Sequence, residues 1–299
     1  MKGSSNKRSP TLGHVEGVSR FLEPSMALEI FRRISFCRYF ELEVIDAFNQ
    51  KRIHSPVYLS LGQEAVPAAT SIVLSHFAIF AQHRCHSTYL AFGGDPIKLI
   101  DELLGRSSGC NKGKGGSAFV QDPKIKMFPH HSMMGENISL SVGYALATNQ
   151  PVVTFFGDAA AEEDYVFGSM GFSVTHRLPI LYICEDNDLS ILTPTHVRRN
   201  WEITNIGRAL GMPVVDISDD PWLIVHYIKE FIRNLPALIN IRTCRYLWHV
   251  GIGKDGPPEW DRYELVKEEL KRLSISFKGI EETSKQLARE LWEKQLQKQ

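Results

Sequence analysis

The hydrophobic residues in the second half of the chain fall into short continuous runs separated by longer segments of mixed polarity. Such runs are typical of strands buried on both faces of a sheet, whereas the segments between them have the length and composition of helices. Four runs have this character: 151–158, 178–188, 212–219 and 235–243. Strands that alternate with helices predict βαβ units, and therefore an α/β fold whose mostly parallel sheet carries helices on both faces.

Helical spacing dominates the first half of the chain. Apolar positions recur at this spacing across residues 24–50, and segments 61–77 and 136–150 are also predicted to be helices. Residues 105–117 contain five glycines, which is too many for the interior of a helix or strand, so we expect a mobile loop there. Residues 263–297 are charged and helical, which favours a solvated helix, with partner binding as an alternative.

The ends of the chain suggest a simple domain organisation. Residues 1–22 are polar and predict a flexible N-terminal arm, and residues 23–299 then form one domain with a C-terminal helical tail. The N-terminal residues lack the apolar stretch of a secretory signal. The five cysteines are scattered and include no Cys-x-x-Cys pair, which suits a reducing compartment. We therefore expect a cytoplasmic protein.

Composition and charge exclude several classes of partner. Hydrophobic residues make up 43% of the 299 residues, enough for a sizeable core. Lys and Arg total 34, as do Asp and Glu, so the formal charge is zero. A nucleic-acid-binding protein usually carries a basic excess, and so does a protein that binds acidic membranes. The sequence therefore predicts neither a nucleic-acid nor a membrane partner.

Two predicted strands end in side chains that could bind a metal ion. Asp158 follows the run 151–157, and Asn187 follows the next strand. Ligands of open parallel sheets bind beyond the carboxyl ends of the strands, and a carboxylate with an amide oxygen suits Mg²⁺. The backbone N–H groups of Ala159 and Ala160, at the start of a helix, would face a phosphate. The alternative is that Asp158 only caps that helix.

The spacing of these residues also carries a family resemblance. Gly157-Asp158-Ala159, followed after 27 residues by Asn187, resembles the thiamine-diphosphate motif. Six further segments match in order: LSLGQEAV (59–66), HRCHSTYLAFGG (83–94), ELLGRSSGCNKGKGGS (102–117), SLSVGYALA (139–147), LPILYICEDND (178–188) and IRTCRYLWH (241–249). Together, over residues 25–265, they resemble the alpha subunit of the thiamine-diphosphate-dependent 2-oxo acid dehydrogenases of the pyruvate, branched-chain and acetoin type.

The resemblance implies a thiamine-diphosphate-binding fold and a set of ligand residues. Asp158 and Asn187 would bind Mg²⁺ through their side chains, and Leu189 through its carbonyl oxygen. The amides of Ala159 and Ala160 would lie against the diphosphate.

The resemblance also assigns residues around the rest of the cofactor. His83 and Arg84 stand where the family has a Tyr-Arg pair, and Arg84 would bind a diphosphate oxygen. Ser132 and Met134 would contact the aminopyrimidine ring through the backbone. Arg245 and His249 would close over the diphosphate. We take His249 and Tyr58 as candidate catalytic residues; the resemblance places Tyr58 where pyruvate-type members carry a substrate-contacting His.

Some positions depart from the family pattern. Ala159 replaces the third residue of Gly-Asp-Gly, and Asp186 replaces the first Asn of an Asn-Asn pair. Phe119 replaces a His, and Val250 replaces the serine that is phosphorylated in animal members. Because the metal and diphosphate ligands are kept, we expect cofactor binding to be intact and the substrate or acceptor to differ from pyruvate.

The resembled family works as two subunits. It decarboxylates a 2-oxo acid and transfers the acyl group to lipoamide, and a Glu of the beta subunit acts as the general base. The resemblance therefore implies an α2β2 assembly, a lipoyl domain as possible partner, and no decarboxylase activity of the isolated chain. Two alternatives are a transketolase-like or acyloin-forming subunit and a catalytically silent paralogue.

Other histidines and cysteines give weaker signals. His83, Cys85 and His86 are close in sequence, but no second ligand pair at zinc spacing accompanies them. His130 and His131 either line the cofactor cleft or form a surface pair.

Overall fold

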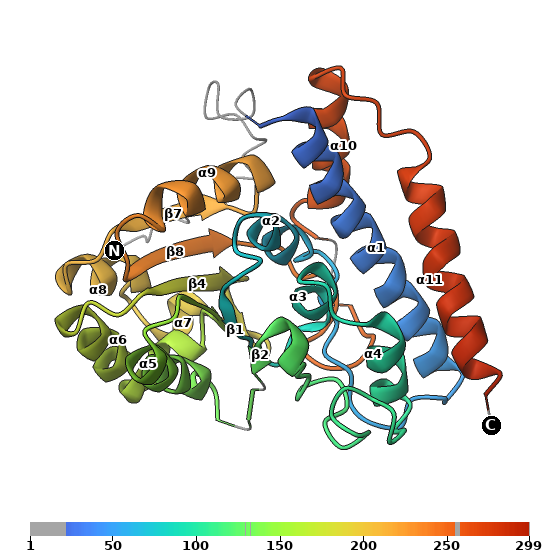
Figure 1. Ribbon diagram of the computed structural model, residues 1–299, viewed down its shortest axis with the longest axis horizontal. Helices are drawn as coiled ribbons and strands as arrows, with labels where there is room; N and C mark the ends of the chain where they lie inside the picture. Colours follow the sequence, from blue (N-terminus) through green and yellow to red (C-terminus); the bar gives the residue numbers. More distant parts are fainter. Residues whose placement is uncertain (1–21, 129, 132, 255–257, 299) are drawn as a thin grey trace.

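A six-stranded parallel sheet forms the centre of the computed structural model, which describes residues 22–128, 130, 131, 133–254 and 258–298 (Figure 1). The spatial order of the strands is β2 (Met127–Phe128), β1 (Ala78–Phe80), β3 (Val152–Gly157), β4 (Ile180–Asp186), β8 (Ala237–Arg242) and β7 (Val214–Ser218). All neighbouring pairs in this sheet are parallel. The α/β fold with a mostly parallel sheet is confirmed.

Helices cover both faces of the sheet because alternate strand residues point in opposite directions. Phe155 and Ile183 pack against the face that carries α1, α2, α3 and α9, whereas Phe156 and Tyr182 pack against α5, α6 and α8. These helices are α1 (Pro24–Asn49), α2 (Ala65–Val73), α3 (His86–Ala91), α9 (Pro221–Phe231), α5 (Glu136–Thr148), α6 (Asp164–Thr175) and α8 (Ile203–Ala209). The four strand runs read from the sequence all correspond to strands of the sheet.

Shorter elements complete the fold. They are α4 (Pro96–Leu103), the 3₁₀ turns η2 (Pro123–Ile125) and η3 (Ala160–Glu162), the β5–β6 hairpin (Leu189–Ser190 and Thr193–Pro194) and α7 (Thr195–Arg198). The predicted helix 61–77 is shorter in the structure, where only Ala65–Val73 is helical. Strand β1 was not predicted, because three residues are too short a run to stand out from the apolar helix before it. None of the helices formed by the described residues has the length and apolar character needed to span a membrane.

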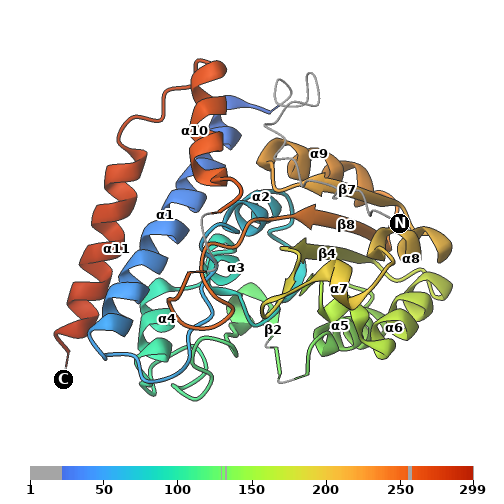
Figure 2. The ribbon, with the colours of Figure 1, turned by 180° about the vertical axis from the view of Figure 1, so that it is seen from behind.

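The C-terminal segment consists of α10 (Arg262–Arg272) and α11 (Ile280–Leu296), which lie on the α1 side of the molecule (Figure 2). Trp292 of α11 is fully buried against Phe40 of α1, with ring centroids 5.7 Å apart. Ser284, Ala288 and Trp292 recur every fourth residue and form the buried stripe of α11. The prediction of a solvated helix was therefore wrong for this stripe, although many charged residues of α11, such as Glu282, Lys285 and Arg289, are exposed.

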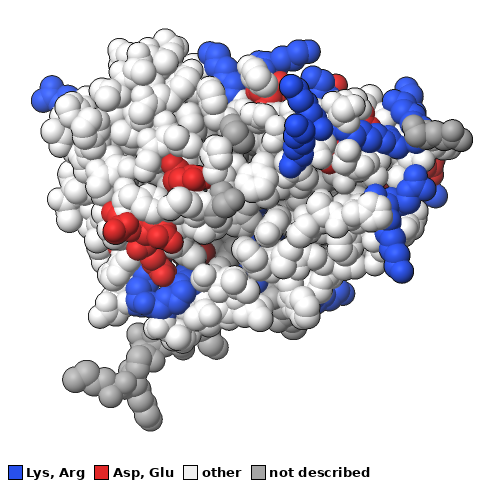
Figure 3. Space-filling view, turned by 90° about the horizontal axis from the view of Figure 1, so that it is seen from below, with Lys and Arg blue, Asp and Glu red and all other residues white. Residues whose placement is uncertain are grey.

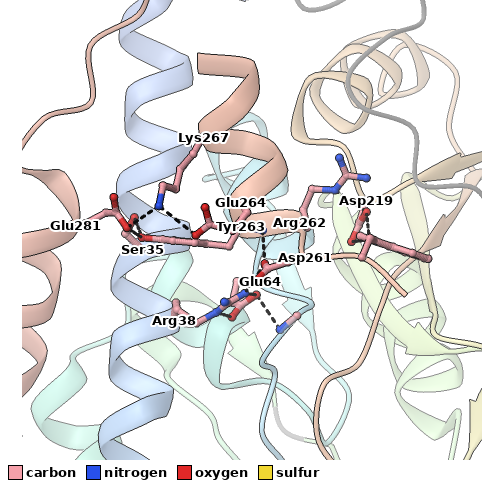
Figure 4. A network of polar contacts seen from close by, with 12 residues as sticks. Ser35, Arg38, Glu64, Asp219, Asp261, Arg262, Tyr263, Glu264, Lys267 and Glu281 are labelled. Carbon is pink, nitrogen blue, oxygen red and sulfur yellow. Dashed lines mark hydrogen bonds and ion pairs between the residues drawn. The ribbon is translucent and has the colours of Figure 1, made fainter. Parts of the chain in front are cut away.

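Buried ion pairs join the helical layer to the sheet (Figure 4). Arg38 of α1 pairs with Glu64 at the start of α2 and lies 3.6 Å from Asp261 at the start of α10. Glu64 also accepts the backbone N–H of Gly62 at 3.0 Å. On the other side of α10, Arg262 donates to Asp219, just after β7, at 2.7 Å. The network therefore fixes the segment 61–64, which borders the candidate site.

Candidate functional site

A cavity of about 270 Å³ lies beyond the carboxyl ends of β3 and β4. It is lined by all ten described residues that sequence analysis assigned to the cofactor or metal: His83, Arg84, Met134, Asp158, Ala159, Ala160, Asn187, Leu189, Arg245 and His249. Ser132 lies outside the described residues. Segments far apart in the chain thus converge on one cavity.

Asp158 lies at this edge of the sheet because β3 ends at Gly157, which pairs with Glu185 of β4. Asp158 is 1% exposed, and the cap position of the 3₁₀ turn that follows is occupied by Ala159, not by Asp158. Burial and the carboxylate of Asp186 raise the pKa of Asp158, against the lowering effect of Arg198. The Asp158 carboxylate therefore interacts with side chains around the cavity.

Asn187 is held in one orientation by two hydrogen bonds. Its side-chain nitrogen donates to Oε1 of the buried Gln63 at 3.2 Å, and its Oδ1 accepts the backbone N–H of Leu189 at 3.1 Å. Gln63 belongs to the LSLGQEAV segment, but sequence reasoning gave it no role. It acts as the residue that positions Asn187.

Ala159 accommodates its methyl group without strain. Its φ of −72° and ψ of −36° are ordinary right-handed values, so no glycine is required at this position. The substitution in the Gly-Asp-Gly pattern is therefore compatible with the backbone that leads into Ala160.

Two buried arginines supply positive charge to the cavity. Arg84 is 5% exposed and donates to the carbonyl oxygens of Leu59 and His249, at 2.5 and 3.0 Å. Arg245 is 6% exposed and donates to the carbonyl of Ile191 at 2.8 Å. Guanidinium groups are suited to phosphate oxygens. The cavity lining thus includes the carboxylate of Asp158, the amide of Asn187 and two cationic groups.

Imidazole rings cluster beside these arginines. The His83 ring centroid lies 5.1 Å from that of His249, 5.8 Å from His130 and 5.0 Å from Tyr58. Burial and the neighbouring Arg84 lower the pKa of His83 well below its usual value, so its imidazole is neutral at pH 7. Its buried Nε2 has no hydrogen-bond partner among the described residues. A ligand in the cavity could satisfy this atom.

A second hollow of about 410 Å³ adjoins Tyr58 and Phe119. The Phe119 ring lies nearly parallel to that of His130, with centroids 6.0 Å apart. The glycine-rich loop 105–117 forms one wall of this hollow. It is irregular, as predicted, but one buried carboxylate organises it: Glu102 accepts backbone N–H groups of Asn111, Gly113, Gly115 and Gly116, at 2.6–3.1 Å.

The other histidines and cysteines that the sequence singled out are divided between buried positions away from the cavity and positions at it. His86 is fully buried and contacts Ser117 at 2.8 Å and Glu41 at 3.4 Å. Burial raises the pKa of the Cys85 thiol. Across residues 22–298, apart from the few that the structure does not describe, no three His, Cys, Asp or Glu side chains are grouped to hold a metal ion. The sequence left open whether His130 and His131 line the cleft or lie on the surface. His130 lines the cavity, whereas His131 is exposed.

These side chains fit a magnesium–diphosphate group better than a metal held by protein alone. Mg²⁺ is usually bound by one or two protein oxygens and takes its remaining ligands from phosphates and water. Asp158, Asn187 and Leu189 line the same cavity as Arg84 and Arg245. The partnerless Nε2 of His83 adds a polar atom for the rest of such a ligand.

Comparisons with known proteins agree with the family resemblance found in the sequence. The family model described as dehydrogenase E1 component matches residues 32–271. The chain is 29% identical to the pyruvate dehydrogenase E1 component subunit alpha-1, mitochondrial, of Oryza sativa, over 76% of this chain and 60% of that protein. It is 25% identical to the pyruvate dehydrogenase E1 component subunit alpha of Rickettsia bellii, over 88% of this chain and 89% of that protein.

Solved structures with the same fold are longer. The transketolase of Campylobacter jejuni matches with a TM-score of 0.59 and 13% identity, over 93% of this chain and 49% of that chain. A transketolase from Leishmania mexicana matches with a TM-score of 0.55 and 12% identity, over 90% and 47%. At these identities the likeness shows the fold, and the chain spans about half the length of the transketolases.

Proposed function

Because the chain belongs to the dehydrogenase E1 component family, we propose that it is the alpha subunit of a thiamine-diphosphate-dependent 2-oxo acid dehydrogenase. One observation carries the proposal: ten residues assigned to the cofactor and metal, from positions 83 to 249, line a single cavity at the carboxyl ends of β3 and β4. Ligands of parallel α/β sheets bind at such edges.

In this proposal, the side chains of Asp158 and Asn187 hold Mg²⁺ together with the carbonyl oxygen of Leu189. The amides of Ala159 and Ala160 and the guanidinium groups of Arg84 and Arg245 bind the diphosphate. Thiamine diphosphate, when bound, supplies a carbon nucleophile and an electron sink for decarboxylation of a 2-oxo acid.

Residues of the chain would orient the substrate. His83 is neutral at pH 7 and can exchange a hydrogen bond at Nε2 without adding charge. Tyr58 and His249, whose ring centroids lie 5.5 Å apart, are placed to contact the substrate. Phe119, stacked on His130, adds an apolar wall beside them. Tyr58 and Phe119 stand at positions where the family carries histidines. These two changes support a substrate or acceptor other than that of pyruvate-type members.

We also propose a beta subunit that supplies a catalytic Glu, in an α2β2 assembly, with a lipoyl domain as acyl acceptor. Large apolar side chains are exposed on segments that border the cavity: Met133, Ile191, Leu192, Val197, Trp248 and Val250. Figure 3 views the molecule from the side of the glycine-rich loop and shows a largely uncharged central surface. Such apolar exposure supports a partner that covers the mouth of the cavity.

Cofactor binding is the first test of this function. Mg²⁺ with thiamine diphosphate at about 100 times its dissociation constant should stabilise the complex purified from its own cells by about 3 kcal/mol. Asp158→Ala should abolish the thermal shift, whereas Asp164→Ala, at an exposed position nearby, should keep it. A wild-type complex without any shift would refute the proposal and would favour a catalytically silent paralogue.

The acceptor is tested by product analysis. With a 2-oxo acid as donor, a dehydrogenase subunit should acylate an added lipoyl domain. Formation of an acyloin from an added aldehyde, with no acylated lipoyl domain, would instead identify a two-carbon transferase. This is the second candidate function, because Tyr58 and Phe119 depart from the family pattern.

A further inference from the structure

The segment 189–199 folds back over Asp158. This segment contains the β5–β6 hairpin and α7, and it begins two residues after Asn187. Its Arg198 donates from Nη2 to Oδ2 of Asp158 at 2.6 Å, and the Thr195 hydroxyl donates to the same oxygen at 3.2 Å. The carboxylate assigned to Mg²⁺ therefore already has a cation bound to it, supplied by the chain itself.

This pair differs from an ordinary surface salt bridge. The side chains of Asp158 and Arg198 are 2% and 11% exposed, so water screens their attraction little. A short charge-assisted hydrogen bond between partly buried groups is also stronger than an exposed one. Sequence analysis gave Arg198 no role.

We propose that Arg198 is an internal counter-ion of the cation site, which competes with Mg²⁺ for the carboxylate of Asp158. The inference rests on the proposed function, because it takes Asp158 to be a magnesium ligand. Loading of the metal then requires the Arg198 guanidinium to leave Oδ2.

Arg198 and Mg²⁺ compete for the Asp158 carboxylate because both are cations and both need space beside Oδ2. A magnesium ligand oxygen lies about 2.0–2.1 Å from the ion. A guanidinium nitrogen 2.6 Å from the same Oδ2 fills one side of that oxygen. Two cations on one buried carboxylate also repel each other. Removal of the Arg198 charge should therefore favour the metal.

The structure also provides a place for the released guanidinium. Nε of Arg198 already donates to Oε1 of Glu162 at 3.0 Å, and Glu162 is more exposed than Asp158. Arg198 can therefore keep one ionic partner on η3 when it gives up the other. The exchange replaces one cation at Asp158 by another and leaves no unpaired buried carboxylate.

The test is a Mn²⁺ titration of wild type and Arg198→Gln. Each full chain is purified with the subunits that accompany it in its own cells, and free Mn²⁺ is counted by electron paramagnetic resonance in the presence of thiamine diphosphate. Loss of a charged hydrogen bond that competes with the metal should tighten the Mn²⁺ dissociation constant about tenfold. Arg208→Gln, which removes an exposed arginine of α8 bonded to Asn205, should leave it unchanged.

The outcomes separate this inference from the proposed function. Mn²⁺ binding by wild type, with equal or weaker binding by Arg198→Gln, would overturn the inference and leave the function intact. Failure of both proteins to bind Mn²⁺ would remove the proposed function and the inference with it. Mn²⁺ binding by both proteins, with a tighter dissociation constant for Arg198→Gln, would support the inference.

Hydrogen exchange gives a second readout that needs no cofactor. Without ligand, the amides of residues 189–199 should exchange faster in Arg198→Gln than in wild type, because the tie to Asp158 is lost. Arg198→Lys, which keeps the charge, should restore part of the protection. Identical exchange in wild type and Arg198→Gln would show that the ion pair does not hold the segment, which would also overturn the inference.

Discussion

Gly62 has no side chain, and this allows the backbone before α2 to lie close to the segment that follows β8 at Cys244. Its φ of +93° is in the left-handed region, and an added Cβ would lie 2.1 Å from the carbonyl oxygen of Cys244. The next two residues are Gln63, which orients Asn187, and Glu64, which pairs with Arg38. Close approach of the backbone at Gly62 therefore supports the side of the cavity that Asn187 lines.

Gly62→Ala should destabilise the protein by at least about 2 kcal/mol more than Gly105→Ala. Both glycines have positive φ, but an added Cβ at Gly105 has no atom within 4 Å, so the difference isolates the steric contact. Urea unfolding of the two variants measures it. Equal midpoints would show that the chain around Cys244 yields to the methyl group.

Asp220 gives a pH-dependent prediction away from the cavity. Burial raises its pKa from 3.8 to about 6, against the lowering effects of Arg262 and of the amides that it caps. Between these two pH values the folded state holds more protons than the unfolded state, so the contribution of Asp220 to stability falls as pH rises. Above pH 6 the full penalty of burying the charge remains.

Asp220→Asn keeps a cap acceptor but does not ionise. Its stability relative to wild type should therefore rise by about 2 kcal/mol between pH 4 and pH 7. Denaturant unfolding at a series of pH values measures this difference. A difference that does not change with pH would show that Asp220 ionises normally in the folded protein.

At the scale of elements, Glu102 ties the glycine-rich loop to the end of α4. Its carboxylate oxygens accept four backbone N–H groups between residues 111 and 116, and the side chain is 1% exposed. Gln at this position has one acceptor oxygen, and its NH₂ group would face amides that also donate.

Glu102→Gln should cost about 2–4 kcal/mol and speed hydrogen exchange in residues 109–116. Glu268→Gln, at an exposed position of α10, is the matched control and should change neither quantity. Unaltered exchange in the loop of Glu102→Gln would mean that other contacts order it.

The packing of α11 on α1 is a second element-scale feature. Trp292→Ala removes a side chain that is 1% exposed and should destabilise the protein by about 3–5 kcal/mol. Leu287→Ala, on the same helix but 46% exposed, should cost well under 1 kcal/mol. Thermal unfolding compares the two. Similar losses would indicate that α11 contributes through its whole surface rather than its buried stripe.

At the scale of the whole molecule, the fold and family were predictable from local signals. Parallel strands that alternate with helices end at one edge of the sheet, so Asp158 and Asn187 were expected to meet there, and both line the cavity. The family resemblance was also confirmed. The assigned roles of the cavity residues stay predictions.

The remaining parts of the site depend on how loops fold back, which no periodic pattern encodes. Arg198 reaches Asp158 across 40 positions, and Glu102 binds a loop that sequence analysis described only as glycine-rich. Gln63 lies in a matched segment, but its contact with Asn187 required the tertiary structure. Charged and amide side chains of this kind have many possible partners in the sequence, and packing selects one.

The pairing of α1 with α11 also has a consequence for protein synthesis. Helix α1 is translated long before Trp292 of α11, which covers Phe40. The part of the α1 surface that α11 covers stays uncovered while more than two hundred residues are translated. The nascent chain must therefore keep this surface from aggregating until α11 leaves the ribosome.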